Sequence, residues 1–142
     1  QDALSLSQAA EFVDKYPEKA AHPIAQLGRN VSGGQKQRLS IARALARKPE
    51  ILIFDDSFSA LDYKTDAALR EGLAKQLPGT TKIIVAQRIS TIRNADQILV
   101  LDRGEIAGLG THDALMASCP VYREIAMSQL SEEELKKGGV SK

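Results

Sequence analysis

Residues 51–56, Ile51-Leu52-Ile53-Phe54-Asp55-Asp56, decide the fold class of this chain. Four consecutive apolar residues that end in two acids are typical of a parallel strand that is buried on both faces. Similar apolar runs follow at 82–86 and 97–101, and helical patterns lie between and around them. Strands that alternate with helices predict an α/β fold with a mainly parallel sheet, in which ligands bind beyond the carboxyl ends of the strands.

The helices around these strands are predicted from apolar residues that recur every three or four positions, and from Gly or Pro at the helix ends. A turn at 102–105 leads to an expected edge strand at 106–109. Residues 17–30 contain prolines and little periodicity, which indicates a connecting loop. The expected helices cover 6–13, 34–47, 65–77, 111–116 and 121–130, and a charged tail follows from Ser131.

The charge balance argues against a generic nucleic-acid binder. The chain has 142 residues, with 19 Lys and Arg against 18 Asp and Glu, so its net charge of +1 provides no basic excess. No apolar run approaches the ~20 residues that span a bilayer. The basic residues in and after the second expected helix are predicted to form a solvated face; they are Lys36, Arg38, Arg43, Arg47 and Lys48.

The chain contains few cysteine and histidine residues, which are common metal ligands in small proteins. Cys119 is the one cysteine, which excludes an internal disulfide and a cysteine-rich metal site. We expect Cys119, next to Pro120, to be an inert or partly exposed thiol. His22 and His112 have no metal-ligand partners at a suitable spacing, so we expect both at the surface.

Residues 31–38, Val-Ser-Gly-Gly-Gln-Lys-Gln-Arg, open the second expected helix. Two glycines after a serine leave backbone N–H groups able to face an anion, and the helix dipole adds positive charge there. The pattern predicts a phosphate-binding helix N-terminus formed by Ser32, Gly33, Gly34 and Gln35. A plain Ser/Gly helix cap accounts for the serine and glycines equally well.

Two further polar positions follow the expected strands. Asp55 ends the first strand, where a carboxylate can hold Mg²⁺, often through its waters, because a hard cation prefers oxygen ligands. An Asp that merely caps a turn is the simpler explanation. Gln87 follows the second strand, where its amide can hydrogen-bond a phosphate or cap the turn into the next helix.

Taken together, these segments resemble the motifs of ATP-binding cassette (ABC) ATPases. Residues 31–38 resemble the LSGGQ-x-QR signature and 51–56 the Walker B strand, while Ser-Ala-Leu-Asp at 59–62 resembles the D-loop and 85–91 the switch loop. The motifs follow the family order over roughly residues 23–130. More narrowly, the runs 55–62 and 86–91 resemble the exporter-type cassettes of bacterial heterodimeric multidrug transporters.

The resemblance implies a P-loop NTPase-type fold, of which this chain is the C-terminal part. Residues 1–48 are then expected in the helical subdomain, 49–130 in the catalytic core and 131–142 in the tail. The implied partners are a second ABC subunit, arranged head to tail, and transmembrane domains in the same full-length chain. The implied location of this domain is the cytoplasmic face of the cell membrane. ATP and Mg²⁺ are the implied cofactors, with Asp55 at the metal and Ser32, Gly33, Gly34, Gln35 and Asp62 at the nucleotide.

Three positions depart from the family pattern. Asp56 stands where a Glu usually orients the attacking water, and its shorter side chain withdraws the carboxylate by ~1.5 Å. Misplacement of ~1 Å can cost on the order of 100-fold in rate. Gln87 stands where His is usual and cannot carry the positive charge of a protonated imidazole. Gln26 replaces the Glu of a loop that touches the membrane domains in such exporters.

Asp56 and Gln87 are the predicted catalytic positions of the chain's own ATP site, whereas the signature serves the partner's site in the family. The chain is therefore expected to be the degenerate-site subunit of a heterodimer that exports drugs or lipids. No G-x-x-x-x-G-K-[ST] occurs in it, so we expect that loop upstream of Gln1 and no activity in the isolated segment. Two alternatives remain: a soluble ABC ATPase of DNA repair, chromosome maintenance or translation, and a non-enzymatic cassette in which nucleotide only holds subunits together.

Overall fold

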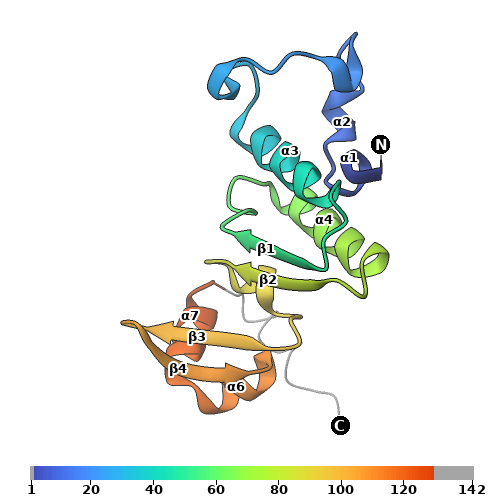
Figure 1. Ribbon diagram of the computed structural model, residues 1–142. Coiled ribbons are helices and arrows are strands. Elements are labelled where there is room, and N and C mark those ends of the chain that lie inside the picture. The colour runs from blue at the N-terminus through green and yellow to red at the C-terminus, as the bar shows by residue number, and fades with distance from the viewer. Residues whose placement is uncertain (1, 130–142) are drawn as a thin grey trace. The chain divides into compact units, whose positions relative to one another are not determined.

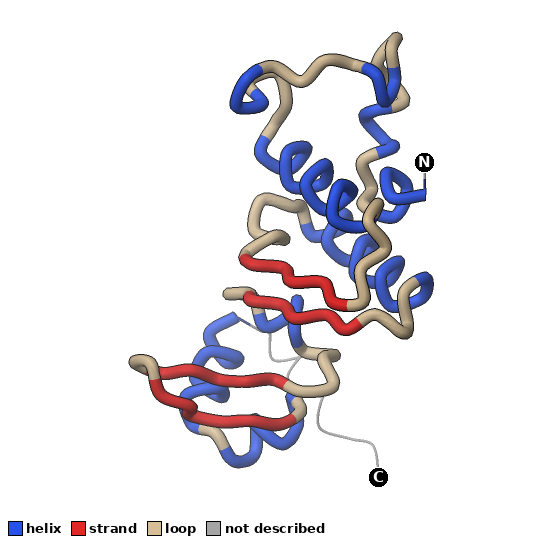
Figure 2. The backbone as a smooth tube through the Cα atoms, in the orientation of Figure 1, coloured by secondary structure: helices blue, strands red, loops and turns tan. Residues whose placement is uncertain are grey.

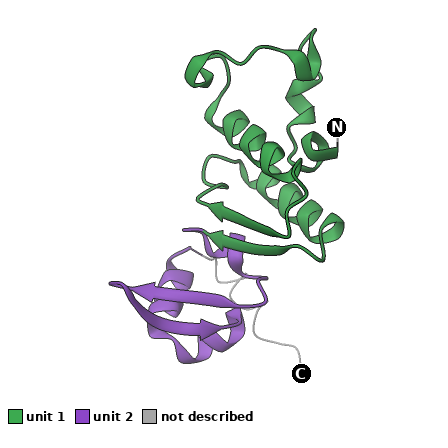
Figure 3. Cartoon of the chain, in the orientation of Figure 1, with its two compact units in different colours: residues 1–85 green, residues 86–142 purple. Residues whose placement is uncertain are grey.

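A computed structural model describes residues 2–129 of the chain (Figure 1). The chain divides into two compact units, residues 1–85 and residues 86–142, which Figure 3 shows in different colours. Both units contain helices and strands (Figure 2), so the predicted α/β class is confirmed. The predicted helix end at Leu130 and the charged tail lie outside the described residues.

The first unit places helices against a parallel pair of strands. Strand β1 (Ile51–Asp55) pairs in parallel with β2 (Thr81–Val85), and Asp55 lies opposite Val85. The two strands therefore end at the same edge of the sheet. The other elements of this unit are α1 (Asp2–Leu6), α2 (Ala10–Val13), two 3-10 turns at Lys19–Ala21 and Gln26–Gly28, α3 (Gly33–Leu45) and α4 (Tyr63–Gln76).

The single helix predicted over 6–13 is wrong, because two short helices occupy this region. Gln8, between α1 and α2, adopts a φ of 60°, in the left-handed region. Its backbone oxygen accepts a hydrogen bond from Arg38 on α3, with 2.9 Å between Nη1 and O. This bond joins residues thirty positions apart, so the apolar spacing of the segment could not reveal the break.

One face of the β1–β2 pair is buried and the other is open. Leu52 and Phe54 are 3% and 2% exposed, whereas Ile51 and Ile53 are 57% and 68% exposed. The prediction of a strand buried on both faces is therefore wrong for the part of the chain that the structure describes. Successive side chains of a strand point to opposite faces, and α3 and α4 supply a core on only one of them. That core contains Leu6, Ile41, Leu45, Leu52, Phe54, Phe58, Leu61, Leu69 and Leu73.

The second unit is built on a β-hairpin. Strand β3 (Ile98–Asp102) pairs antiparallel with β4 (Glu105–Gly110), as the predicted turn and edge strand require. Arg103 and Gly104 between them both have positive φ, 47° and 85°, which suits a tight hairpin turn. The remaining described elements of this unit are α5 (Ile89–Ile92), α6 (His112–Ser118) and α7 (Pro120–Gln129).

The second unit buries His112, which was expected at the surface, and Cys119, for which partial exposure was one of two expectations. Cys119 is 3% exposed, and its thiol donates to the backbone oxygen of Ala107 at 3.6 Å. His112 is 7% exposed, and its Nδ1 lies 2.8 Å from the hydroxyl of Tyr122. Each side chain packs in the core with its polar group satisfied by a partner from elsewhere in the unit, which spacing along the chain does not show. The core contains Ile89, Ile98, Val100, Leu115, Cys119, Tyr122 and Ala126.

None of the helices within residues 2–129 combines the length and the apolar character that a bilayer crossing requires.

Candidate functional site

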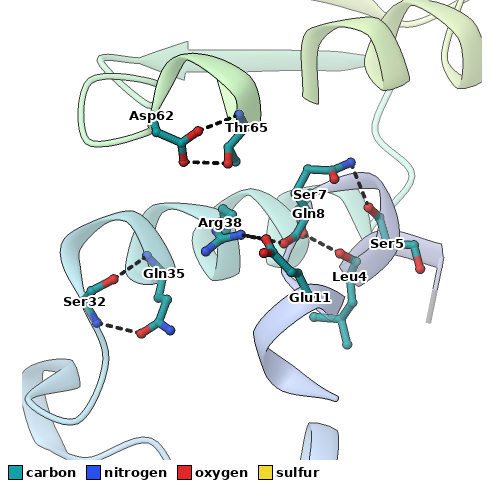
Figure 4. A network of polar contacts seen from close by, with 10 residues as sticks. All are labelled: Leu4, Ser5, Ser7, Gln8, Glu11, Ser32, Gln35, Arg38, Asp62 and Thr65. Carbon is teal, nitrogen blue, oxygen red and sulfur yellow. Dashed lines mark hydrogen bonds and ion pairs between the residues drawn. The ribbon is translucent and has the colours of Figure 1, made fainter. Parts of the chain in front are cut away.

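The N-terminus of α3 is formed by the predicted nucleotide-binding residues. Ser32 is the N-cap, and its hydroxyl accepts a hydrogen bond from the Gln35 backbone N–H at 3.2 Å. The Gln35 side chain accepts in turn from the Ser32 backbone N–H at 2.8 Å, which completes a capping box (Figure 4). Ser32 and Gly33 are exposed, so the positive end of a 13-residue helix faces the surface.

Gly34 packs against the loop that follows β1. A Cβ atom built on Gly34 would lie 2.9 Å from the backbone oxygen of Ala60, closer than real contacts allow. A Cβ on the neighbouring Gly33 would meet only the Ala60 side chain, at 3.9 Å, which is ordinary contact. Gly34 is therefore required by the packing of helix against loop, whereas Gly33 leaves space for a ligand.

Asp55 and Asp56 lie at the carboxyl end of β1 and are both exposed. Asp56 adopts a φ of 48°, which Asp tolerates better than most residues, and its backbone N–H donates to Val85 at 3.1 Å. Its backbone oxygen accepts from the hydroxyl of Ser59 at 3.0 Å. The backbone at Asp56 is thus held on both sides, while its carboxylate remains at the surface.

Asp62 is the N-cap of α4. Its carboxylate accepts from the hydroxyl of Thr65 at 2.7 Å and from the Thr65 backbone N–H at 3.0 Å. These two bonds, the hydroxyl first, lower the pKa of Asp62 below its ordinary value, so the group is ionised at neutral pH. In this structure Asp62 stabilises its own helix, and any contact with nucleotide would compete with Thr65.

Gln87 belongs to the second unit. Its side chain is exposed, and its backbone oxygen accepts from the Gln129 amide at 2.8 Å. The same Gln129 side chain accepts from the backbone N–H of Ile89 at 2.9 Å, so it holds residues 87–89 through two hydrogen bonds. The structure describes Gln87 within that unit alone, whereas the signature segment, Asp55, Asp56 and Asp62 all belong to the first unit.

The sequence reasoning missed two residues that organise the site, Gln37 and Arg38. The Gln37 amide binds the loop that follows β1 through three hydrogen bonds. Arg38 was predicted on a solvated face, but its guanidinium lies 4.9 Å from the Phe12 ring centre and forms an ion pair with Glu11 at 2.9 Å. That prediction is wrong for Arg38, which joins α3 to α2 and, through the Gln8 backbone oxygen, to the link between α1 and α2 (Figure 4).

The residues fit a Mg²⁺ ion held partly by a nucleotide. Among residues 2–129 there is no group of three or more His, Cys, Asp or Glu side chains that could hold a metal alone. Magnesium does not need one, because it is usually bound through one or two carboxylates, several waters and the phosphates of its substrate. The exposed carboxylate of Asp55 at the strand end supplies such a ligand.

Comparison with known proteins agrees with the motifs. A family model described as "ABC transporter" matches residues 4–59. An uncharacterized ABC transporter ATP-binding protein of Mycobacterium tuberculosis is 54% identical over 90% of this chain and 22% of its own length. Multidrug resistance protein 4 of Entamoeba histolytica is 42% identical over 89% of this chain and 10% of its own length.

A solved structure extends the similarity to three dimensions. The structure of a bacterial Atm1-family ABC exporter with ATP bound matches with a TM-score of 0.86 and 36% identity, over 92% of this chain and 23% of that one. The chain thus spans about a fifth of the length of the first curated relatives that it matches. On the combined evidence of motifs, fold and relatives, this chain belongs to the ABC transporter family and is a segment of its ATP-binding domain.

Proposed function

We propose that this chain is part of the ATP-hydrolysing domain of an ABC exporter, and that it is the degenerate-site subunit of a heterodimer. The observation that carries the proposal is the contrast between two neighbouring elements of the first unit. The signature helix begins with an intact Ser-Gly-Gly-Gln segment at its exposed N-terminus. The strand beside it ends in Asp55-Asp56, so the position of the usual Glu carries the shorter acid.

The proposed roles follow from these positions. Asp55 holds Mg²⁺, which supplies positive charge against the phosphates when it is bound. On the resemblance to the family alone, we assign Asp56 and Gln87 to the chain's own ATP site, where Asp56 would orient water less well than Glu because its carboxylate is set back by ~1.5 Å. Ser32, Gly33, Gly34 and Gln35 offer N–H groups and the helix dipole to the phosphates of the partner subunit's nucleotide.

Two similarities support an exporter rather than a soluble ABC ATPase. The matched solved structure is an exporter, and one relative is a multidrug resistance protein. In the proposed transporter, this domain is joined to membrane-spanning domains and lies at the cytoplasmic face of the membrane. The transporter exports drugs or lipids. The isolated 142-residue segment is expected to be inactive, because it contains no G-x-x-x-x-G-K-[ST] loop.

The test is the steady-state ATPase activity of the full-length pair. Gly33→Glu places a negative charge at the signature without steric conflict, since a Cβ there meets nothing closer than 3.9 Å. It should abolish nearly all turnover, while the uncharged Gly33→Gln should retain more. Asp56→Asn should cost far less than Gly33→Glu, because its site contributes little hydrolysis.

A second experiment tests the proposal through a gain of activity. Asp56→Glu combined with Gln87→His should add hydrolysis at the chain's own site, which nucleotide trapping would assign to that site. Equal losses from Gly33→Glu and Asp56→Asn would contradict the degenerate-site proposal and indicate two equivalent sites. A full-length pair that hydrolyses no ATP would contradict the ATPase proposal itself.

A further inference from the structure

Gln37 joins the signature helix to the loop that follows β1. Its Nε2 donates to the backbone oxygen of Asp56 at 3.4 Å and to the hydroxyl of Ser59 at 3.2 Å. Its Oε1 accepts from the backbone N–H of Ala60 at 3.0 Å. A primary amide suits this position because it offers a donor and an acceptor at one end, so both polar directions of the loop backbone are satisfied.

The loop that Gln37 binds has little freedom of its own. The Ser59 hydroxyl donates to the Asp56 backbone oxygen at 3.0 Å, and the Asp56 N–H is held by Val85 at 3.1 Å. Asp56 is also in the left-handed region, with a φ of 48°. The direction of its side chain is therefore fixed by backbone contacts, two of which involve Gln37 or its partner Ser59.

The other end of the connection is the signature segment. Gln37 lies one helical turn from Gly33 and Gly34 on α3. Gly34 packs so closely on the Ala60 backbone oxygen that a Cβ would be 2.9 Å away. A shift of the helix N-terminus must therefore move the loop, unless the Gln37 amide gives up its hydrogen bonds.

We infer that Gln37 is a positioning residue that couples the two ATP sites of the dimer through this chain. The inference rests on the proposed function, in which Ser32–Gln35 complete the partner's site while Asp56 belongs to the chain's own site. Binding of the partner's nucleotide at the α3 N-terminus displaces the helix, and Gln37 transmits the displacement to the Asp56 backbone. The connection is a pair of contiguous contacts within one compact unit, so it requires no long pathway.

The alternative is that Gln37 only stabilises the loop. Cooperativity distinguishes a structural role from a coupling role. A bond that only stabilises the loop changes the amount of folded protein, but it does not change how ATP binding at one site affects the other site. The variants are Gln37→Ala, which removes all three bonds, and Gln37→Glu, which keeps an acceptor for Ala60 but loses the donor. Ser40→Ala, at an exposed position of the same helix, is the matched control.

The experiment measures ATPase rate against ATP concentration in the full-length transporter pair, together with its thermal midpoint. We expect Gln37→Ala to bring the Hill coefficient to about 1, while kcat and KM each change by less than about twofold, because the Asp56 site contributes little hydrolysis in the proposed function. Gln37→Glu should give an intermediate loss of cooperativity. Ser40→Ala should match the wild type in all three quantities.

Several outcomes would overturn the inference. A Gln37→Ala protein that keeps the wild-type Hill coefficient has no positioning role, and one that keeps it while its activity falls in proportion to its folded fraction has a structural role. If Gln37→Ala does not fold, Ser59→Ala is the second variant, because it removes the hydroxyl that accepts from Gln37 and donates to the Asp56 backbone oxygen. It should reduce the Hill coefficient in the same direction, and an unchanged coefficient overturns the inference. A wild-type pair without ATPase activity contradicts the proposed function instead, so the two failures are distinguishable.

Discussion

The candidate-site groups of residues 2–85 lie at the surface, although the same unit also buries Asp66, which is 1% exposed and paired with Arg70 at 3.0 Å. Residues 86–129 hold a polar pair inside their core. In the first unit, Ser32, Asp56 and Asp62 are exposed, and nearby side chains or backbone groups bind the segments that carry them. In the second unit, His112 and Tyr122 are 7% and 2% exposed and bind each other at 2.8 Å.

The difference separates polar groups that can exchange partners from those that cannot. An exposed group loses little when a ligand replaces its present partner, because water or the ligand satisfies it. A buried group that loses its partner remains unsatisfied at a cost of about 1–3 kcal/mol. The exposed groups of the first unit can therefore exchange partners, whereas Asp66 of that unit and the His112–Tyr122 pair of the second unit are structural.

The largest expected effect tests whether the two units unfold independently. Leu69 in α4 is 0% exposed, so Leu69→Ala should lower the stability of the first unit by about 2–5 kcal/mol. Leu99→Ala, at a 52% exposed position of β3, is the control and should change stability by about 0.5 kcal/mol or less. Region-resolved hydrogen exchange of the full-length protein reads each unit separately. Equal loss of protection in both units after Leu69→Ala would show that they open together.

A smaller effect should fall on the second unit alone. Tyr122→Phe removes the partner of the His112 ring nitrogen while it keeps the aromatic volume, and should cost about 1–3 kcal/mol. Tyr63→Phe, at a position of α4 that is 67% exposed, is the matched control and should be nearly neutral. Faster hydrogen exchange confined to β3, β4 and α7 would support the prediction. Protection equal to that of the control would show that the pair contributes no stability.

The smallest effect is a difference in pH dependence. Burial, and then the positive charge of Arg93, lower the pKa of His112, while Asp113 opposes them. The unfolded state, with a His pKa of ~6.5, then takes up the proton first as pH falls. Stability of the second unit should therefore decline as pH falls through ~6.5, and level off below the folded pKa.

The carboxylates of the first unit titrate in a lower range. Hydrogen bonds from His22, Thr65 and Lys75 lower the pKa of Glu18, Asp62 and Glu71 below their ordinary values of 4.5, 3.8 and 4.5. Their contribution is present above those values and is lost only as pH falls further. As the pH falls from 7 to 5, hydrogen exchange should thus show the second unit losing protection before the first. The substitution His112→Gln should remove this pH dependence. An equal slope in both units would contradict the assignment to His112.

The parts of the structure that the sequence predicted well are those that depend on near neighbours. The cap of α3 joins Ser32 to Gln35, three residues away, and the hairpin turn at 102–105 is set by its own residues. Helix and strand positions followed from periodicity for the same reason, because side chains three, four or two positions apart share a face. The motif segments also belong to this local level, which is why they indicated the family.

Tertiary structure alone decided which polar side chains connect the elements and which are buried. Gln37 and Ser59 are 22 positions apart, and Arg38 and Gln8 are 30 apart, so no local pattern announces either bond. The same holds for His112 and Cys119, whose burial depends on Tyr122 and Ala107 from other elements. Spacing along the chain determines the face on which a side chain lies, but only packing determines what covers that face and which distant partner satisfies a polar group there.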